Sequence, residues 1–215
     1  MIFAAIDFET FYDKECSVTE LGAEAYTRHP RYYAYLVAIK VGNREWCGDP
    51  KDPECPWHLL DGIPWVAHNA QFDYCVWKRL FESGDVAATP SQWFDTTAIP
   101  AYMQVGRDLA NASWVLLGKE VSKDIRNKAK GKHWKDFDPT MQQLMIEYAM
   151  NDTRLCYELF EKHRSDVPDE EWALSEMTMF QGIHGVQINT DLLESHLKTV
   201  AEKQTELISQ IRKGS

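Results

Sequence analysis

The sequence predicts an α/β fold: a mixed five-stranded sheet flanked by helices, with a C-terminal helical extension. Three observations predict it. A compact apolar run opens the chain, two strands joined by a tight turn follow it, and later apolar runs alternate with helical patterns. The 215 residues, 44% of them hydrophobic, are enough to bury a substantial core. This composition excludes intrinsic disorder as the main state of the chain.

The expected strands are short apolar or alternating runs bounded by turn residues. The first is a continuous apolar run typical of a buried strand, and Gly42 with Asn43 supplies the turn of a hairpin between the second and third. The first three strands are therefore expected to be antiparallel. The predicted strands cover residues 1–8, 32–41, 44–47, 63–67 and 93–94.

The expected helices combine apolar residues at helical spacing with recognisable start and stop residues. Asp138 and Pro139 start the longest one, and Pro168 ends it. A domain boundary is placed there, dividing residues 1–167 from a helical segment 168–213, with 214–215 interpreted as a cloning remnant. The predicted helices cover residues 69–82, 97–103, 108–117, 138–163, 170–181 and 190–211.

Charge and cysteine content limit the possible partners and the compartment. The 33 acidic residues outnumber the 23 basic ones, giving a net charge of −10, so any contact with nucleic acid must be local. One basic segment, residues 119–135, could hold backbone phosphates or be a solvated loop. Five cysteines without C-x-x-C spacing favour a reducing, cytoplasmic setting, and the sequence has no apolar run long enough to cross a membrane.

Two carboxylates lie at the end of the first predicted strand. Asp7 and Glu9 are two residues apart, and because strand side chains alternate between faces, both project to the same side. This arrangement makes them a candidate pair of divalent-metal ligands. The alternative, and the default for an isolated pair of this spacing, is a solvated strand end; the preceding apolar run places the pair at the edge of a buried strand and makes that alternative less favoured.

Two further carboxylates lie on predicted helices. Asp73 falls in the first turn of helix 69–82, where it could also compensate the helix dipole, and Asn69 is expected to cap that helix. Tyr148 and Asp152 are four residues apart on one helix face; the alternative is a core tyrosine and an aspartate paired with Arg154 or a lysine. If the four acids converge, their hard oxygen ligands suit Mg²⁺ or Mn²⁺ rather than zinc.

The three motifs together resemble those of the DEDD 3′–5′ exonucleases. The matching segments are Ile6-Asp7-Phe8-Glu9-Thr10, His68-Asn69-x-x-Phe72-Asp73 and Tyr148-x-x-x-Asp152, in the same order and with the same spacing. A tyrosine four residues before the last aspartate is typical of the tyrosine subclass. The chain is most similar to the proofreading exonuclease domain of family A DNA polymerases, particularly phage-type ones, and the ribonuclease H-like architecture is the fold that this resemblance implies.

The resemblance implies a two-metal mechanism that removes nucleoside monophosphates from a 3′ end. Asp7 would bridge two divalent cations, Glu9 and Asp152 would hold the ion that activates water, and Asp73 would support the second ion. Tyr148, with an ordinary pKa of ~10, is better suited to orient the attacking water than to act as a base. The expected substrate is a single-stranded or frayed 3′ end of DNA, contacted by Thr10, Phe11, Tyr12, His68, Asn69 and Phe72.

The resemblance continues beyond the boundary at Pro168. Met179-x-x-Gly182 and the following Gly185-Val186-Gln187-Ile188-Asn189 are similar to the segment that begins the polymerase part of this family, although the family often has Asp where Asn189 stands. An attached polymerase domain and a bacterial or phage-infected host cell are the implied context. Two other hypotheses remain: an exoribonuclease of the RNase D type, and a non-catalytic DNA-holding module. The presence of all four acids and the tyrosine argues against the latter.

Overall fold

The computed structural model describes residues 1–121 and 124–213. It divides into two compact units, Met1–Ile183 and His184–Ser215. The expected cloning remnant at 214–215 lies outside the described residues. In the described part of the chain, no helix is long and apolar enough to cross a membrane.

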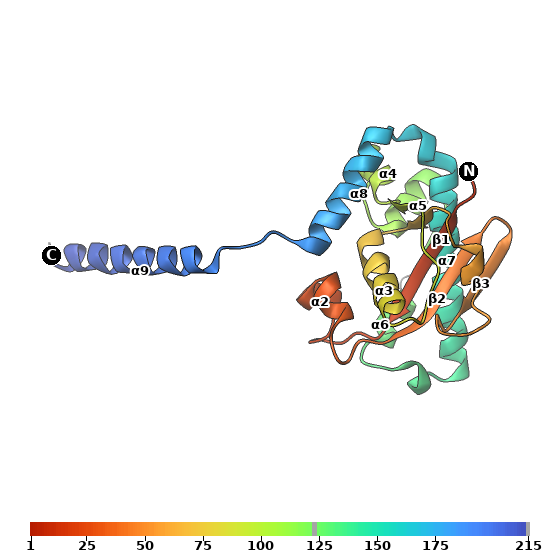
Figure 1. Cartoon of the computed structure of the whole chain (residues 1–215), viewed down its shortest axis with the longest axis horizontal. Helices are drawn as coiled ribbons and strands as arrows, with labels where there is room; N and C mark the ends of the chain where they lie inside the picture. The colour runs from red at the N-terminus through yellow and green to blue at the C-terminus, as the bar shows by residue number, and fades with distance from the viewer. Residues whose placement is uncertain (122–123, 214–215) are drawn as a thin grey trace. The chain divides into compact units, whose positions relative to one another are not determined.

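The first unit is built on a five-stranded mixed sheet, as the sequence predicts (Figure 1). Its strands lie in the order β3-β2-β1-β4-β5, with β2 antiparallel to both β1 and β3, and β4 parallel to both β1 and β5. Gly42 has φ 55°, which suits the tight turn between β2 and β3. The strands are β1 (Ala4–Thr10), β2 (Ala34–Val41), β3 (Arg44–Gly48), β4 (Trp65–Ala67) and β5 (Trp93–Asp95).

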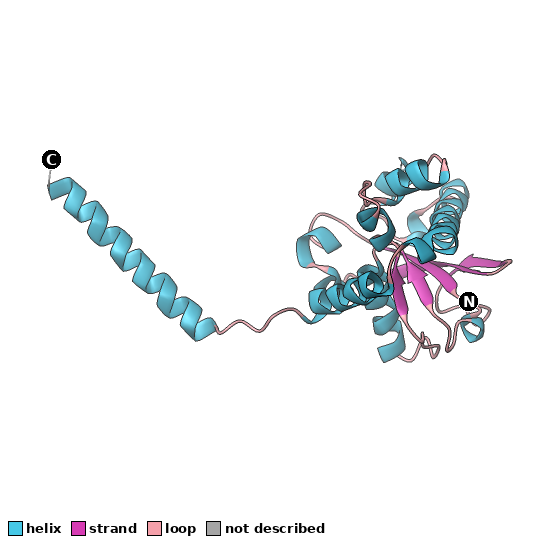
Figure 2. Ribbon diagram, turned by 90° about the horizontal axis from the view of Figure 1, so that it is seen from above, coloured by secondary structure: helices cyan, strands magenta, loops and turns pink. Residues whose placement is uncertain are grey.

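Helices cover both faces of this sheet (Figure 2). Ile6 and Phe8 of β1 share a buried cluster with residues of α3 (Ala70–Glu82) on one face. Ala5, which points the opposite way, packs with α5 (Leu109–Leu117) and α7 (Pro139–His163) on the other. This alternation along β1 decides which side chains face α7.

Short helices complete the first unit, and several of them were not predicted because four to six residues give too little periodicity to recognise. The expected helix 97–103 is present as α4 (Ala98–Tyr102). Asp138 caps α7 as expected, accepting a hydrogen bond from the Met141 amide at 2.8 Å. The unpredicted elements are α1 (Val18–Leu21), α2 (Ala23–Thr27), α6 (Asp124–Ala129) and the 3₁₀ turns η1 (Trp57–Leu59), η2 (Trp134–Asp136) and η3 (Arg164–Asp166).

Helix α8 (Asp169–His184) packs into the first unit, so this unit continues past the expected boundary at Pro168. Trp172 is 3% exposed, and its ring lies 5.3 Å from that of Phe94 and 5.5 Å from that of Phe160. Met179 and Ile183 are buried in the cluster on the α3 face. The division at residue 167 between an exonuclease and a polymerase segment stays a prediction.

The second unit contains one long helix, α9 (Thr190–Lys213). Leu193, Leu197 and Val200 are among its exposed apolar side chains. They recur at helical spacing, so the helix is amphipathic.

Candidate active site

The five residues predicted to carry the chemistry line one cavity of about 720 Å³. They come from three elements that are far apart in the sequence. The acids of the first motif lie on β1, the second acid lies in the first turn of α3, and the last pair lies in the middle of α7. The fold therefore brings together Asp7, Glu9, Asp73, Tyr148 and Asp152.

Asp7 and Glu9 project from β1 on its α7 side. The residue between them, Phe8, is 2% exposed and packs on the α3 side. Asp7 and Glu9 are both half-buried, and in the antiparallel ladder they lie opposite Ala38 and Leu36 of β2. The two-residue spacing thus places both carboxylates on one face, as the sequence predicts.

Asp73 is the most buried acid of the cavity, with 1% of its surface exposed. Its Oδ1 accepts a hydrogen bond from the Phe8 amide at 3.0 Å, which fixes the start of α3 against β1 between the first two acids. Burial raises the pKa of Asp73 well above its ordinary value, and the charges of Asp95 and Glu9 add to the increase against the opposing Phe8 amide bond. A charged Asp73 therefore needs a compensating cation.

Tyr148 and Asp152 lie one turn apart on α7, and both line the cavity. Burial raises the pKa of the Tyr148 hydroxyl above its ordinary value, and the nearby carboxylates of Asp152, Glu9 and Asp7 raise it further. Tyr148 consequently keeps its proton at ordinary pH. As a neutral hydrogen-bond partner it can orient a polar group, but it cannot act as a general base.

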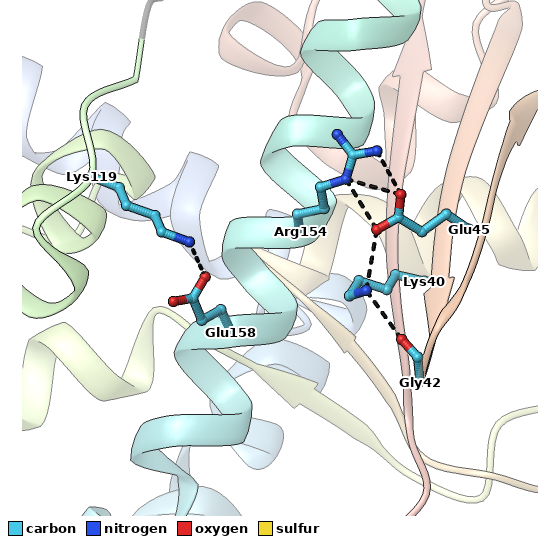
Figure 3. Close-up of polar contacts among 6 residues, drawn as sticks. All are labelled: Lys40, Gly42, Glu45, Lys119, Arg154 and Glu158. Carbon is cyan, nitrogen blue, oxygen red and sulfur yellow. Dashed lines mark hydrogen bonds and ion pairs between the residues drawn. The ribbon is translucent and has the colours of Figure 1, made fainter.

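The alternative that Asp152 pairs with Arg154 is wrong. Arg154 points across to β3, where its Nε lies 3.0 Å from both oxygens of Glu45 and its Nη2 lies 2.5 Å from Oε2 (Figure 3). Glu45 also accepts from Lys40 Nζ of β2 at 3.1 Å. This network ties α7 to the sheet just after Asp152, leaving Asp152 directed to the cavity lining.

The donor set of the cavity is made of hard carboxylate oxygens, which suits Mg²⁺ or Mn²⁺ by ligand type. Among the described residues, however, no three His, Cys, Asp or Glu side chains are already arranged around a point that could hold a metal ion. The acids share a cavity without forming a closed cluster. Negatively charged carboxylates in one cavity repel one another, and a bound cation would offset this repulsion and bring them closer together.

Most of the predicted substrate residues line the same cavity. Thr10, Tyr12, His68, Asn69 and Phe72 all contribute to its lining. The structure does not bring the sixth residue, Phe11, to this lining. Phe11 is 5% exposed, and its ring stacks on that of His133 at 4.4 Å.

Asn69 does not cap α3 through its side chain, so that expectation is wrong. Its backbone is left-handed, with φ 70° and ψ 53°, a conformation that asparagine tolerates better than most residues. Its amide donates to Asp95 Oδ1 at 3.0 Å. Asn69 contributes to the cavity lining.

Described residues of the basic segment 119–135 contribute to the lining of the cavity. Val121 and Asn127 line it, and the Gly131 amide donates to the Tyr12 carbonyl at 2.8 Å. Lys119 forms an ion pair with Glu158 of α7 rather than facing the cavity (Figure 3). Lys123 and the side chain of Arg126 lie outside the described residues.

Arg107 is the functional candidate that sequence reasoning missed. It lies in the loop between α4 and α5, and among the described residues that line the cavity it is the sole lysine or arginine. Its Nη2 donates to Thr97 Oγ1 at 3.3 Å, and Thr97 also lines the cavity. A Gly-Arg-Asp run before a helix start is the only local signal, and it does not show which way the arginine points.

Comparison with known proteins identifies the fold. No protein-family model matches the sequence, and no curated protein matches it. Among solved structures, Brucella melitensis NrnC is 19% identical, with a TM-score of 0.53 covering 85% of this chain and 82% of that one.

Two RNase D structures are also similar. Trypanosoma brucei RNase D in complex with RNA U12 is 15% identical, with a TM-score of 0.58 over 86% of this chain and 65% of that one. Escherichia coli RNase D, described as an exoribonuclease involved in structured RNA processing, is 16% identical, with a TM-score of 0.55 over 86% of this chain and 46% of that one. At these identities the likeness establishes the fold alone: a ribonuclease H-like sheet with flanking helices, shared with NrnC and RNase D.

Proposed function

We propose that the chain is a divalent-metal-dependent 3′–5′ exonuclease that hydrolyses the terminal phosphodiester bond of a nucleic acid. One observation carries the proposal: the residues of the three exonuclease-like motifs line a single cavity although they lie on three separate elements. A chance match of short motifs gives no reason for such convergence. In its finer form, the proposal is an exodeoxyribonuclease that proofreads for a family A DNA polymerase attached beyond residue 167.

Four carboxylates would hold the two divalent cations: Asp7, Glu9, Asp73 and Asp152. When bound, Mg²⁺ or Mn²⁺ supplies a Lewis acid that lowers the pKa of water and stabilises the leaving oxygen. A solved structure of B. melitensis NrnC contains bound Mg²⁺, which supports the divalent-cation part of the proposal. Asp7 would be the ligand shared by both ions: it lies on the same face of β1 as Glu9, and the Asp73 carboxylate accepts from the amide of Phe8, the residue after Asp7.

The other lining residues would bind and orient the substrate. Tyr148 stays protonated beside Asp152 and can hold the attacking water by a hydrogen bond. Arg107 can pair with a backbone phosphate, which matters because the four carboxylates otherwise repel a polyanion. Phe72 and Tyr12 offer ring surfaces for the terminal bases, and stacking of this kind is worth ~1–3 kcal/mol per base.

RNA is the alternative substrate, and a specific observation favours it. Two of the similar structures are RNase D proteins, one of them in complex with RNA. A further NrnC structure is bound to pGG. Resemblance of the motifs to a polymerase proofreading domain supports DNA, so the substrate must be decided by experiment.

The test is cleavage of 5′-labelled single-stranded DNA and RNA of identical sequence, with Mg²⁺, Mn²⁺ or EDTA. We expect a ladder shortening from the 3′ end that requires the cation and is lost in Asp7→Asn. Asp191→Asn, in the second unit and outside the cavity, is the matched control and should cleave normally. Faster shortening of DNA supports the proofreading form, and faster shortening of RNA moves the assignment to the RNase D type. Cleavage that persists in EDTA or in Asp7→Asn would refute the proposal.

A further inference from the structure

A chain of polar contacts beside the cavity is centred on the buried residue Thr96. This residue follows β5, is 0% exposed and does not contribute to the cavity lining. Its Oγ1 lies 2.9 Å from His68 Nδ1 and 3.6 Å from Cys156 Sγ. On its far side, His68 Nε2 lies 2.9 Å from the carbonyl oxygen of Arg107. Three side chains thus connect α7, the start of α3 and the loop that carries Arg107.

The donors along this chain follow from what each atom can do. A carbonyl oxygen only accepts, so His68 Nε2 must carry a proton to bond with the Arg107 carbonyl. Burial lowers the pKa of His68 and favours the neutral ring, which has a single N–H. Nδ1 is therefore an acceptor, and the Thr96 hydroxyl donates to it. Thr96 Oγ1 in turn can accept from the Cys156 thiol.

A competing acceptor for the Thr96 hydroxyl is less favourable. The Ala67 carbonyl lies 3.3 Å from Oγ1, a longer contact than the 2.9 Å to His68. That carbonyl already accepts the backbone amide of Thr96 at 2.9 Å. The Thr96 hydroxyl therefore donates its hydrogen bond to His68 Nδ1 rather than to the Ala67 carbonyl.

The loop at the end of this chain is tightly built. Gln104 has φ 57°, which is rare for a residue other than glycine. A Cβ on Gly106 would lie 2.7 Å from the side chain of Asn111, so a larger residue there would have to displace that side chain. His68 bonds to the backbone carbonyl of Arg107 in this loop, and Arg107 itself contributes to the cavity lining.

We infer that Thr96 is a positioning residue for substrate binding: its hydroxyl fixes the Nε2–H form of His68, and His68 holds the Arg107 loop at the cavity. This inference rests on the proposed function, since Arg107 is assigned to a substrate phosphate there. Asp73 has a separate contact, because its Oδ1 accepts a hydrogen bond from the Phe8 amide at 3.0 Å.

Thr96→Val and Thr96→Ser form the matched pair that tests the inference. Valine keeps the shape and removes the hydroxyl, while serine keeps the hydroxyl. Loss of one neutral hydrogen bond in Thr96→Val should raise KM about fivefold and leave kcat within about twofold. Thr96→Ser should restore KM to within about twofold of wild type. An unchanged KM in folded Thr96→Val, or a fall in kcat alone, would refute the positioning role.

The tautomer is measured on the full chain by long-range ¹H–¹⁵N NMR, with His68→Gln used to assign the signals. We expect an unprotonated Nδ1 and a protonated Nε2 in the wild-type protein and in Thr96→Ser. A protonated Nδ1 would overturn the inference. This readout needs no activity: if the expected tautomer is found in a chain that cleaves neither DNA nor RNA, the proposed function fails while the assigned hydrogen-bond chain stands.

Discussion

The burial of an acidic residue in the cavity opposes folding and is suited to binding a cation. Asp73 shows it most clearly, because it is 1% exposed and close to the charges of Asp95 and Glu9. A buried carboxylate without a cation is unfavourable, and the amide bond from Phe8 offsets only part of the cost. A buried carboxylate of this kind is expected at a functional site that binds a compensating cation.

We expect Asp73→Asn to stabilise the metal-free protein and to abolish cleavage. The pKa of Asp73 is raised in the folded state, so the folded chain holds this proton more tightly than the unfolded chain. The free energy of unfolding of the wild type should therefore fall as pH rises above 3.8, the ordinary pKa of this carboxyl group. The side-chain amide in Asp73→Asn does not ionise, so the variant should not lose stability in this way. Urea unfolding in EDTA at pH 7 should show a gain of about 1–2 kcal/mol. A less stable variant in EDTA would contradict this account.

We expect Tyr148→Phe to lower kcat about tenfold without changing the alkaline limb of the pH–rate profile. The hydroxyl orients but does not ionise, because burial and the nearby carboxylates raise its pKa above the ordinary range. Rates measured from pH 6 to 10 should therefore run parallel for the variant and the wild type. A tyrosine-dependent rise near pH 10, present only in the wild type, would show that the phenolate is the active form.

Helix α7 depends on its anchoring to the sheet as well as on its apolar face. Arg154 follows Asp152 by two residues and forms two-oxygen contacts with Glu45 of β3. Lys40 of β2 joins the same carboxylate. A short ion-pair network at this point fixes the turn of α7 that presents Tyr148 and Asp152 to the cavity.

We expect Glu45→Gln to weaken the fold in a pH-dependent manner. Arg154 and Lys40 lower the pKa of Glu45 from 4.5 to about 2, so its stabilisation is present above pH 4.5 and is lost as pH falls toward 2. The side chains are partly exposed, which limits the effect at pH 7 to about 1 kcal/mol or less. Urea unfolding at several pH values measures it, with Glu158→Gln as the control for a single exposed pair. A constant difference from pH 7 to 3 would exclude this origin.

At the scale of the whole molecule, the two compact units differ in what they bury. The first contains the sheet, the cavity and α8, whose Trp172 packs against Phe94 and Phe160. The second consists mainly of α9, which buries little apolar surface of its own. Helices α8 and α9, which follow Pro168, are therefore expected to contribute very differently to the free energy of unfolding.

Two truncations separate these contributions. A chain ending at His184 should unfold within about 2 °C of the full chain, because α9 belongs to the other unit. A chain ending at Val167 also loses Trp172, Met179 and Ile183 from the core, and its melting temperature should fall by about 10 °C. Calorimetry on the three chains measures both shifts. Equal melting temperatures for the two truncations would show that α8 is dispensable.

The sequence by itself determined the elements that carry long patterns. The order and pairing of the first three strands, the limits of α3 and α7 and the common face of Asp7 and Glu9 all follow from local periodicity and turn residues. The same patterns placed each candidate acid on the correct element. Periodicity is a property of neighbouring residues, so one sequence is enough to read it.

Only the tertiary structure decided which side chains share the cavity. It assigned Arg107 to the lining, placed Phe11 in the core and gave Asn69 a left-handed backbone held by Asp95. It also extended the first unit beyond Pro168 through the burial of Trp172. These outcomes depend on contacts between residues far apart in the chain, which no local pattern encodes.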